Sequence, residues 1–216
     1  MTVKKIKIKA LLIISILCMF FILGLSGCGG GGSRGPSPFQ AAFLALAMND
    51  QAVADLGTSL SDRLPELTID GRAPLFTTMP MGDDQSAGGA MRMDPMMGMG
   101  MTVRFSALIA SSEIDVVIAN MDNAARFSRS DFFAPLSDIL SENEIAQLGD
   151  RLLSFELVDI DGTAAVGTGE FTAVVGFDIS DNDQIREIFG NQEVGIFVIG
   201  NSGKLDLSRA MLRFFF

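Results

Sequence analysis

The clearest buried strand in the chain is Ile114-Asp115-Val116-Val117-Ile118-Ala119. Its apolar residues run continuously instead of alternating with polar ones, and they are rich in β-branched Val and Ile. Such a strand is buried on both faces, which is typical of a parallel sheet covered by helices. A helix over 121–128 is expected directly after it. The sequence around this strand therefore predicts an α/β domain.

Further strands and helices alternate on either side of it. We expect strands at Phe39–Ala47, Leu67–Asp70, Thr172–Ile179 and Val194–Ile199. Apolar residues at helical spacing predict helices over 50–64, along Met101, Phe105, Leu108 and Ile109, behind a Ser141/Glu144 capping box, after Ser180, and along Leu207 and Met211. Phe155–Asp161 and the returning strand suggest a hairpin or a crossover pair. The predicted fold is α/β, with a mainly parallel sheet flanked by helices.

The amino-terminal 27 residues have the composition of a secretory signal peptide. Four lysines precede the apolar run Ala10–Leu25, and small residues precede Cys28. Leu25-Ser26-Gly27-Cys28 resembles the bacterial lipobox, and this resemblance implies removal of residues 1–27 and a diacylglyceryl lipid on Cys28. The expected location is a membrane-anchored one on the extracytoplasmic face. An uncleaved transmembrane helix is the alternative, but the apolar run is short for one.

Composition narrows the possible functions. Residues 28–38 form a Gly/Ser/Pro tether, which leaves 39–216 as the folded domain. After residue 27 there are 26 acidic and 12 basic residues, a net charge of −14, which disfavours nucleic acid as a partner. The chain has no His, and its two cysteines are Cys18 and Cys28, so the domain has neither the commonest general base nor a thiol. We expect no enzyme activity and no cofactor besides the lipid.

Three segments together resemble extracellular solute-binding lipoproteins with the type-2 periplasmic-binding fold. They are Ala107–Ile118, Asp131-Phe132-Phe133-Ala134-Pro135-Leu136-Ser137-Asp138, and Val194–Ser202 leading to Ala210–Phe215. Members of that family have two lobes that enclose a ligand. Here only about twenty residues, Phe155–Val174, stand where the second lobe would be inserted. The resemblance therefore implies a protein shortened to about one lobe.

Polar residues follow the predicted strands, where open α/β sheets bind their ligands. Their carboxylates and amides are suited to an amine or a hydroxylated solute. Helix capping accounts for the same residues equally well. The candidate ligand-binding residues are Asn49, Asp50, Asn120, Asp122, Asp178, Ser180, Asn201 and Ser202.

A methionine-rich segment over 79–101 is expected to be a loop without regular structure. Thioethers select Cu(I) over harder ions, so the segment is a candidate metal site, although no His or Cys accompanies it. Its alternative role is adaptable apolar filler. The candidate copper ligands are Met79, Met81, Met91, Met93, Met96, Met97, Met99 and Met101.

Three classes of function are compatible with these features. The first is a solute-binding-like module of unknown ligand, held at the membrane by its lipid. The second is a structural lipoprotein that contacts another protein, such as a membrane protein. The third is a Cu(I)-handling protein. The sequence favours the first, because the three resembling segments occur in the family's order.

Overall fold

The structure is a computed structural model, and it describes residues 37–81, 95–161 and 164–216. Ser37–Phe216 forms one unit by its internal contacts. The predicted signal peptide, Cys28 and most of the predicted tether lie outside the described residues, as do Met91 and Met93. None of the described helices is long and apolar enough to cross a membrane.

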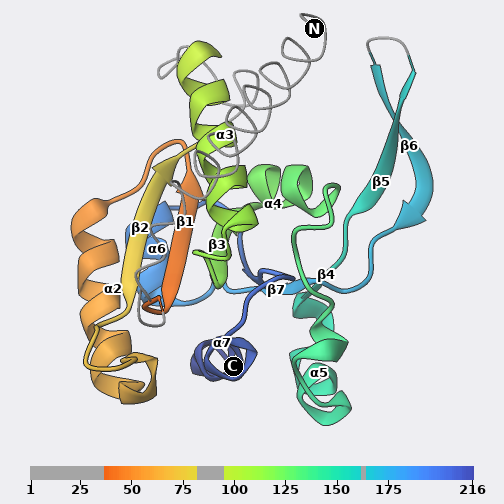
Figure 1. The fold of residues 1–216 in the computed structure, drawn as a ribbon. Coiled ribbons are helices and arrows are strands. Elements are labelled where there is room, and N and C mark those ends of the chain that lie inside the picture. Colours follow the sequence, from red (N-terminus) through yellow and green to blue (C-terminus); the bar gives the residue numbers. More distant parts are fainter. Residues whose placement is uncertain (1–36, 82–94, 162–163) are drawn as a thin grey trace, which may run out of the picture. The chain divides into compact units, whose positions relative to one another are not determined.

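A six-stranded sheet lies at the centre of this unit, in the strand order β2-β1-β3-β8-β7-β4 (Figure 1). Its first three strands are parallel to one another. The last three continue the sheet by antiparallel pairing. The strands are β1 (Gln40–Ala45), β2 (Leu75–Pro80), β3 (Val116–Asn120), β4 (Leu152–Leu153), β7 (Gly176–Asp178) and β8 (Val194–Val198).

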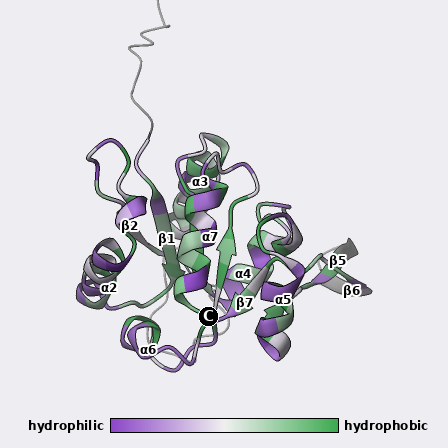
Figure 2. Cartoon of the chain, turned by 90° about the horizontal axis from the view of Figure 1, so that it is seen from below, coloured by the Kyte–Doolittle hydropathy of each residue, from purple (hydrophilic) through white to green (hydrophobic). Residues whose placement is uncertain are grey.

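Helices cover both faces of this sheet. They are α2 (Asp50–Arg63), α3 (Pro95–Ala110), α4 (Met121–Ser128), α5 (Glu142–Leu148), α6 (Asp183–Phe189) and α7 (Leu205–Phe214). Single 3-10 turns occur at Pro65–Leu67, Leu136–Asp138 and Gly149–Arg151. Figure 2 shows hydrophobic strands at the centre and much of the hydrophilic surface on the surrounding helices.

The core is divided by the sheet into two layers. Successive residues of β1 face opposite layers: Phe43 packs with α2 and α6, and Leu44 packs with α3. In β3, Ile118 faces the first layer and Val117 the second. All four side chains are fully buried. The continuous apolar pattern of these strands is thus explained by burial on both faces.

The α/β prediction is confirmed, but the sheet is mixed instead of mainly parallel. Among the described strands, β8 runs antiparallel to β3, with Val116 opposite Val198 and Asn120 opposite Val194. A strand buried on both faces has the same apolar pattern in either direction, so the sequence carried no signal of the reversal. The reversal changes which residues share an edge of the sheet.

The second strand was predicted in the wrong place. Leu67 ends a 3-10 turn, and Ile69 and Arg72 form a bridge around a turn in which Asp70 and Gly71 have positive φ. The chain then enters the true second strand, β2, at Leu75. The apolar Leu67 packs in the core beneath α2 and does not belong to the sheet.

The prediction that 79–101 is an irregular loop is wrong at both ends. β2 extends to Pro80, and α3 begins at Pro95. Met79 and Met81 are buried in the same layer of the core as Phe105 of α3. Residues 82–94, between these elements, lie outside the described residues. The methionines near β2 are therefore packing residues of the sheet.

A separate two-stranded hairpin projects from the end of the six-stranded sheet. It consists of β5 (Glu156–Asp161) and β6 (Ala164–Phe171), paired antiparallel, and Figures 1 and 2 show it extending away from the helices. It lies between β4 and β7 in the sequence, within the segment 155–174. A hairpin does occur here, but the predicted returning strand, Thr172–Ile179, is wrong: β5 pairs with Ala164–Phe171, and Gly176–Asp178 forms the separate strand β7.

Candidate functional site

A groove lies beside the base of the hairpin, and we call it the hairpin groove. It has a volume of about 880 Å³ and is open to solvent. Its walls come from the carboxyl end of α3, the segment 128–135, the base of the β5–β6 hairpin, and Gly200-Asn201. A volume of this size accommodates a drug-sized solute or a short peptide segment.

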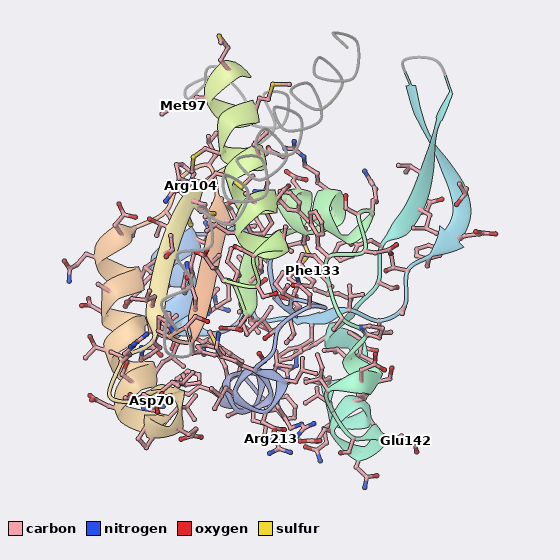
Figure 3. All side chains as sticks on the ribbon, viewed as in Figure 1. Asp70, Met97, Arg104, Phe133, Glu142 and Arg213 are labelled. Carbon is pink, nitrogen blue, oxygen red and sulfur yellow. The ribbon has the colours of Figure 1, made fainter. Side chains whose placement is uncertain are left out.

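Aromatic side chains form the floor of this groove. Phe133 is buried and stacks on Phe197 of β8, with ring centroids 4.6 Å apart. Phe132 is half-buried and stacks on Phe127 of α4 at 6.1 Å. Figure 3 labels Phe133 between α4 and the base of the hairpin. The half-buried Phe132, supported by these stacked rings, offers a ligand an aromatic contact.

Backbone contacts hold the aromatic pair in place. Phe133 forms an isolated antiparallel bridge with Ile199, and the Gly200 amide donates to the Phe132 carbonyl at 2.8 Å. The Asn201 side-chain amide donates to the carbonyl of Ile109 at 2.8 Å and so fixes the carboxyl end of α3. The segment after β8 thus joins the aromatic floor to the helix that walls the groove.

Polar groups at the groove are acidic or neutral. Asp131 and Asp138 are exposed at its rim, and hydroxyl groups of Ser106 and Thr172 lie among the lining residues. None of its lining residues is Lys or Arg. The groove therefore combines an apolar floor with a negative rim, and its potential favours a cationic ligand over an anionic one.

The carboxyl ends of β1 and β3 carry four of the predicted site residues, and two of these are helix caps. The Asn49 side chain accepts hydrogen bonds from the amides of Gln51 and Ala52 at the start of α2, and Asp50 lies in the first turn. Asn120 caps α4 in the same way through the amide of Asn123. At these positions the capping alternative is confirmed.

Two asparagine side chains at this edge also donate hydrogen bonds to residues distant in sequence. Asn120 donates to Gln192 at 2.9 Å, and Asn123 donates to the Met81 carbonyl at 2.9 Å. Asn120 and Asp122 line a shallow cavity of about 210 Å³ together with Glu193. Among the described residues no buried polar side-chain atom lacks a hydrogen-bond partner. Nothing at this edge points to a ligand beyond these contacts.

Asp178, the last residue of β7, and Ser180 lie together, but they bind each other. Asp178 accepts from both the amide and the hydroxyl of Ser180, and the Ser180 hydroxyl accepts from the Val194 amide at 2.8 Å. The prediction that Ser180 caps the next helix is wrong, because Asn182 caps α6. Ser180 instead ties the end of β7 to the start of β8.

Asn201 and Ser202 lie at the opposite edge of the sheet from the other predicted residues, because β8 is antiparallel to β3. The structure therefore does not bring all eight candidate residues together. Asn201 lines the hairpin groove, whereas the Ser202 hydroxyl donates to Asp115 at 2.7 Å.

Asp115 is the centre of a buried ion pair at this amino edge. Its side chain is fully buried, and its oxygens accept from Lys204 Nζ at 2.9 and 3.1 Å. The Gln40 amide at the start of β1 donates to the same carboxylate at 2.9 Å. The carboxylate thus joins β1, β3 and the segment before α7, and its contacts assign it a structural role.

The candidate copper ligands are divided between two environments. Met79 and Met81 are buried, and Met101 is half-buried against the same layer of the core. Met96, Met97 and Met99 are exposed on the first turns of α3. The described methionines therefore do not form one cluster, and Cu(I) binding stays a prediction for the exposed ones.

The groove residues Asp131, Asp138, Leu157 and Thr172 were not among the predicted site residues. The sequence did mark Phe132-Phe133 through the resemblance, but as part of a fold pattern. Asp131 has a positive φ of 52°, which is uncommon for any residue other than glycine and most tolerated by Asn and Asp. Such a conformation is not readable from the sequence, and only the folded hairpin completes the groove.

Comparisons of the chain with protein-family models, with curated proteins and with solved structures found no match. The site is therefore interpreted from its own geometry.

Proposed function

We propose that this protein is a lipoprotein anchored through Cys28 to the extracytoplasmic face of a membrane, and that its domain binds a cationic, partly apolar solute in the hairpin groove. The observation that carries the proposal is the groove itself: about 880 Å³, with Phe132 and Phe133 below and carboxylates at the rim. Among the described residues, no basic side chain lines the groove to compete for those carboxylates.

The place of the hairpin supports a binding function. In two-lobed solute-binding proteins, which the sequence resembles, the second lobe provides one wall of the ligand site. Here the β5–β6 hairpin occupies that place in the chain, and Leu157 and Thr172 at its base line the groove. A short hairpin leaves the groove open, so we expect weaker retention and faster release than in an enclosed site.

The anchor is supported by the sequence alone. Two acyl chains hold a protein at a membrane far more firmly than one, because each buried methylene contributes about 0.8 kcal/mol. Mass spectrometry of detergent-extracted protein should show a diacylglyceryl group and the loss of residues 1–27. Retention of Met1, or unchanged membrane association of a Cys28→Ala variant, would contradict it. We infer no enzymatic role, because the chain has no His and its domain no thiol.

Thermal shift with purified protein tests the ligand. Ligands that bind the folded state raise the melting midpoint by mass action. We expect alkyl- and arylamines, polyamines and Lys- or Arg-containing peptides to raise it, and matched carboxylates to have no effect. A double variant, Asp131→Asn with Asp138→Asn, should lose this response, since the rim charge is removed and asparagine tolerates the positive φ of residue 131.

The matched control is Asp122→Asn at the opposite edge, which should respond like the wild type. If the double variant keeps the full response, the ligand binds outside the groove.

A protein partner is the second candidate, and one observation favours it. The hairpin forms its own two-stranded sheet. Phe171, the last residue of β6, lies opposite Glu156 at the base of the hairpin and is 62 % exposed. Exposed strand edges and aromatic side chains are common features of protein interfaces. If the folded protein shows no shift with any small molecule, the groove and hairpin are better explained as a surface for a protein segment.

A further inference from the structure

The largest group of exposed apolar side chains in the described residues lies on the amino-terminal half of α3. Met96, Met97, Met99 and Val103 have exposed fractions of 84, 61, 73 and 64 %. We call these four residues the α3 patch. The other large apolar side chains reported as exposed, Leu75, Phe171 and Phe216, belong to three different elements.

Three of the four patch residues share one face of the helix, and Met97 lies about 100° around the helix from Met96. Met96, Met99 and Val103 are separated by three and four residues, so they lie on one face of the helix. The buried residues of α3, Phe105 and Ile109, lie in its carboxyl-terminal half and pack on the sheet. Figure 3 shows Met97 near the amino end of the helix and Arg104 further along it. One half of α3 is thus held by the core while the other half presents methionines to its surroundings.

Charge distinguishes α3 from the rest of the surface. Pro95–Ala110 contains no acidic residue, and its one charged residue is Arg104, which is exposed. The chain after residue 27 has a net charge of −14. A bilayer with phosphate groups at its surface repels acidic faces of the domain and does not repel this one. Self-association through this patch would bring two strongly negative domains together.

We propose that the α3 patch docks on the lipid bilayer to which the protein is anchored, so that the methionines and Val103 enter the interface between headgroups and acyl chains. The inference rests on the lipid anchor proposed at Cys28. The eleven residues from Cys28 to Pro38 reach at most about 36–40 Å, which exceeds the roughly 24 Å length of the sixteen-residue α3. The tether is therefore long enough for either end of the helix to meet the membrane.

The α3 patch and the lipid anchor would bind the same membrane together. Four side chains alone bind a bilayer weakly, but the anchor makes docking an intramolecular event at high effective concentration. Methionine is suited to such a contact because its flexible thioether adapts to an irregular apolar surface. Docking would fix the orientation of the domain and hence of the hairpin groove relative to the membrane.

Site-specific labelling of the lipidated full-length product tests this inference. With Cys28 acylated and Cys18 removed with the leader, a Met97→Cys variant has one thiol for a polarity-sensitive fluorophore. Reconstituted in phosphatidylcholine vesicles containing a shallow nitroxide lipid, this label should show a blue shift and nitroxide quenching. The same label on Glu187→Cys, an exposed position on α6, should show neither.

A second variant, with Met96→Ser, Met99→Ser and Val103→Ser added to Met97→Cys, should lose the blue shift and the quenching. Its melting midpoint should be unchanged, since the three replaced side chains are exposed. Protein that floats with the vesicles but shows no difference between positions 97 and 187 overturns the docking and leaves the anchor standing. Protein that does not float overturns the anchor and the docking with it. Quenching that depends on protein density and not on nitroxide identifies a second copy, and likewise overturns lipid docking.

Discussion

At the carboxyl edge of the parallel strands the helix caps come from neighbours in sequence, whereas the buried carboxylate at the amino edge binds residues distant in sequence. At the carboxyl edge, Asn49 and Asn120 cap the helices that begin one residue later. At the amino edge, Asp115 binds Lys204, 89 residues away, and the Gln40 amide, 75 residues away.

The two edges therefore differ in the kind of contact that stabilises them and in their distance from the hairpin groove. Local caps satisfy helix amides at the carboxyl edge, where ligands of open α/β sheets usually bind, and the cavity that Asn120 and Asp122 line there is shallow. The distant contacts at the amino edge hold segments together beside the hairpin groove. We therefore expect substitutions at the amino edge to have larger effects on stability, and the following predictions test that expectation.

The largest effect is expected for Asp115→Ala. Removing the carboxylate leaves the Lys204 ammonium, whose side chain is only 14 % exposed, without its partner. Breaking a buried pair in this way costs about 3–5 kcal/mol of the free energy of unfolding. Urea denaturation followed by circular dichroism measures the change. The control is Asp206→Ala, which removes an exposed ion pair with Arg209 and should cost less than about 1 kcal/mol. Equal losses in the two variants would contradict the structural role of Asp115.

Gly176→Ala tests the packing of the same end of the sheet. A Cβ at this position would lie 2.5 Å from the Ile196 carbonyl oxygen and against the ring of Phe197, the residue beneath the groove floor. The backbone has to shift, and we expect a loss of about 1–3 kcal/mol in the free energy of unfolding. Gly200→Ala is the matched control, because its Cβ would have its nearest neighbour at 3.6 Å. A thermal midpoint as low for Gly200→Ala as for Gly176→Ala would show that the strain is not local to Phe197.

At the carboxyl edge, Asn49→Ala should have a smaller effect. The variant loses the side-chain oxygen that accepts from the Gln51 and Ala52 amides, and the loss of such a cap costs about 1 kcal/mol. Asn49→Asp keeps the acceptor and should retain the wild-type stability. Chemical denaturation of the three proteins side by side measures the difference. If Asn49→Ala is as damaging as Asp115→Ala, the edges do not differ as we infer.

Features set by neighbouring residues were predictable from the sequence. The Asn49 cap, the Ser141–Glu144 capping box and the apolar stripe of α7 depend on spacings of a few residues, and the structure confirms them. β1, β3 and β8 were predicted because a strand buried on both faces is continuously apolar.

Features that depend on contacts between distant residues were not predictable from the sequence. The strand β2 contains Thr77 and Thr78 and ends in Pro80, a composition that is compatible with a strand only at the edge of a sheet, where the structure places it. The direction of β8 and the Asp115–Lys204 pair depend on how the segments assemble. For the same reason the sequence did not show that Asn201 lies at the other edge from Asn49 and Asn120, because that depends on the direction of β8.

Glu144 combines both kinds of contact in one residue and gives the smallest predicted effect. Its carboxylate accepts from the Ser141 amide and hydroxyl at 2.8 and 2.6 Å, and from Arg213 Nε at 2.7 Å across 69 residues. Hydrogen bonding to Arg213, followed by the bonds to Ser141, lowers the pKa of Glu144 from 4.5 to about 2. A lowered pKa in the folded state means that this contribution to stability is fully present above pH 4.5 and is lost as the pH falls toward 2.

Titration separates the effects of Arg213 and Ser141 on the pKa of Glu144. In an Arg213→Gln variant the distant partner is gone and the local cap remains, so the pKa of Glu144 should rise but stay below 4.5. In a Ser141→Ala variant it should rise less, because the bond to Arg213 is the largest cause of the shift. Side-chain NMR titration of Glu144 in the two variants and the wild type measures both changes. A larger rise in Ser141→Ala than in Arg213→Gln would show that here the local contact outweighs the distant one, the reverse of what we expect.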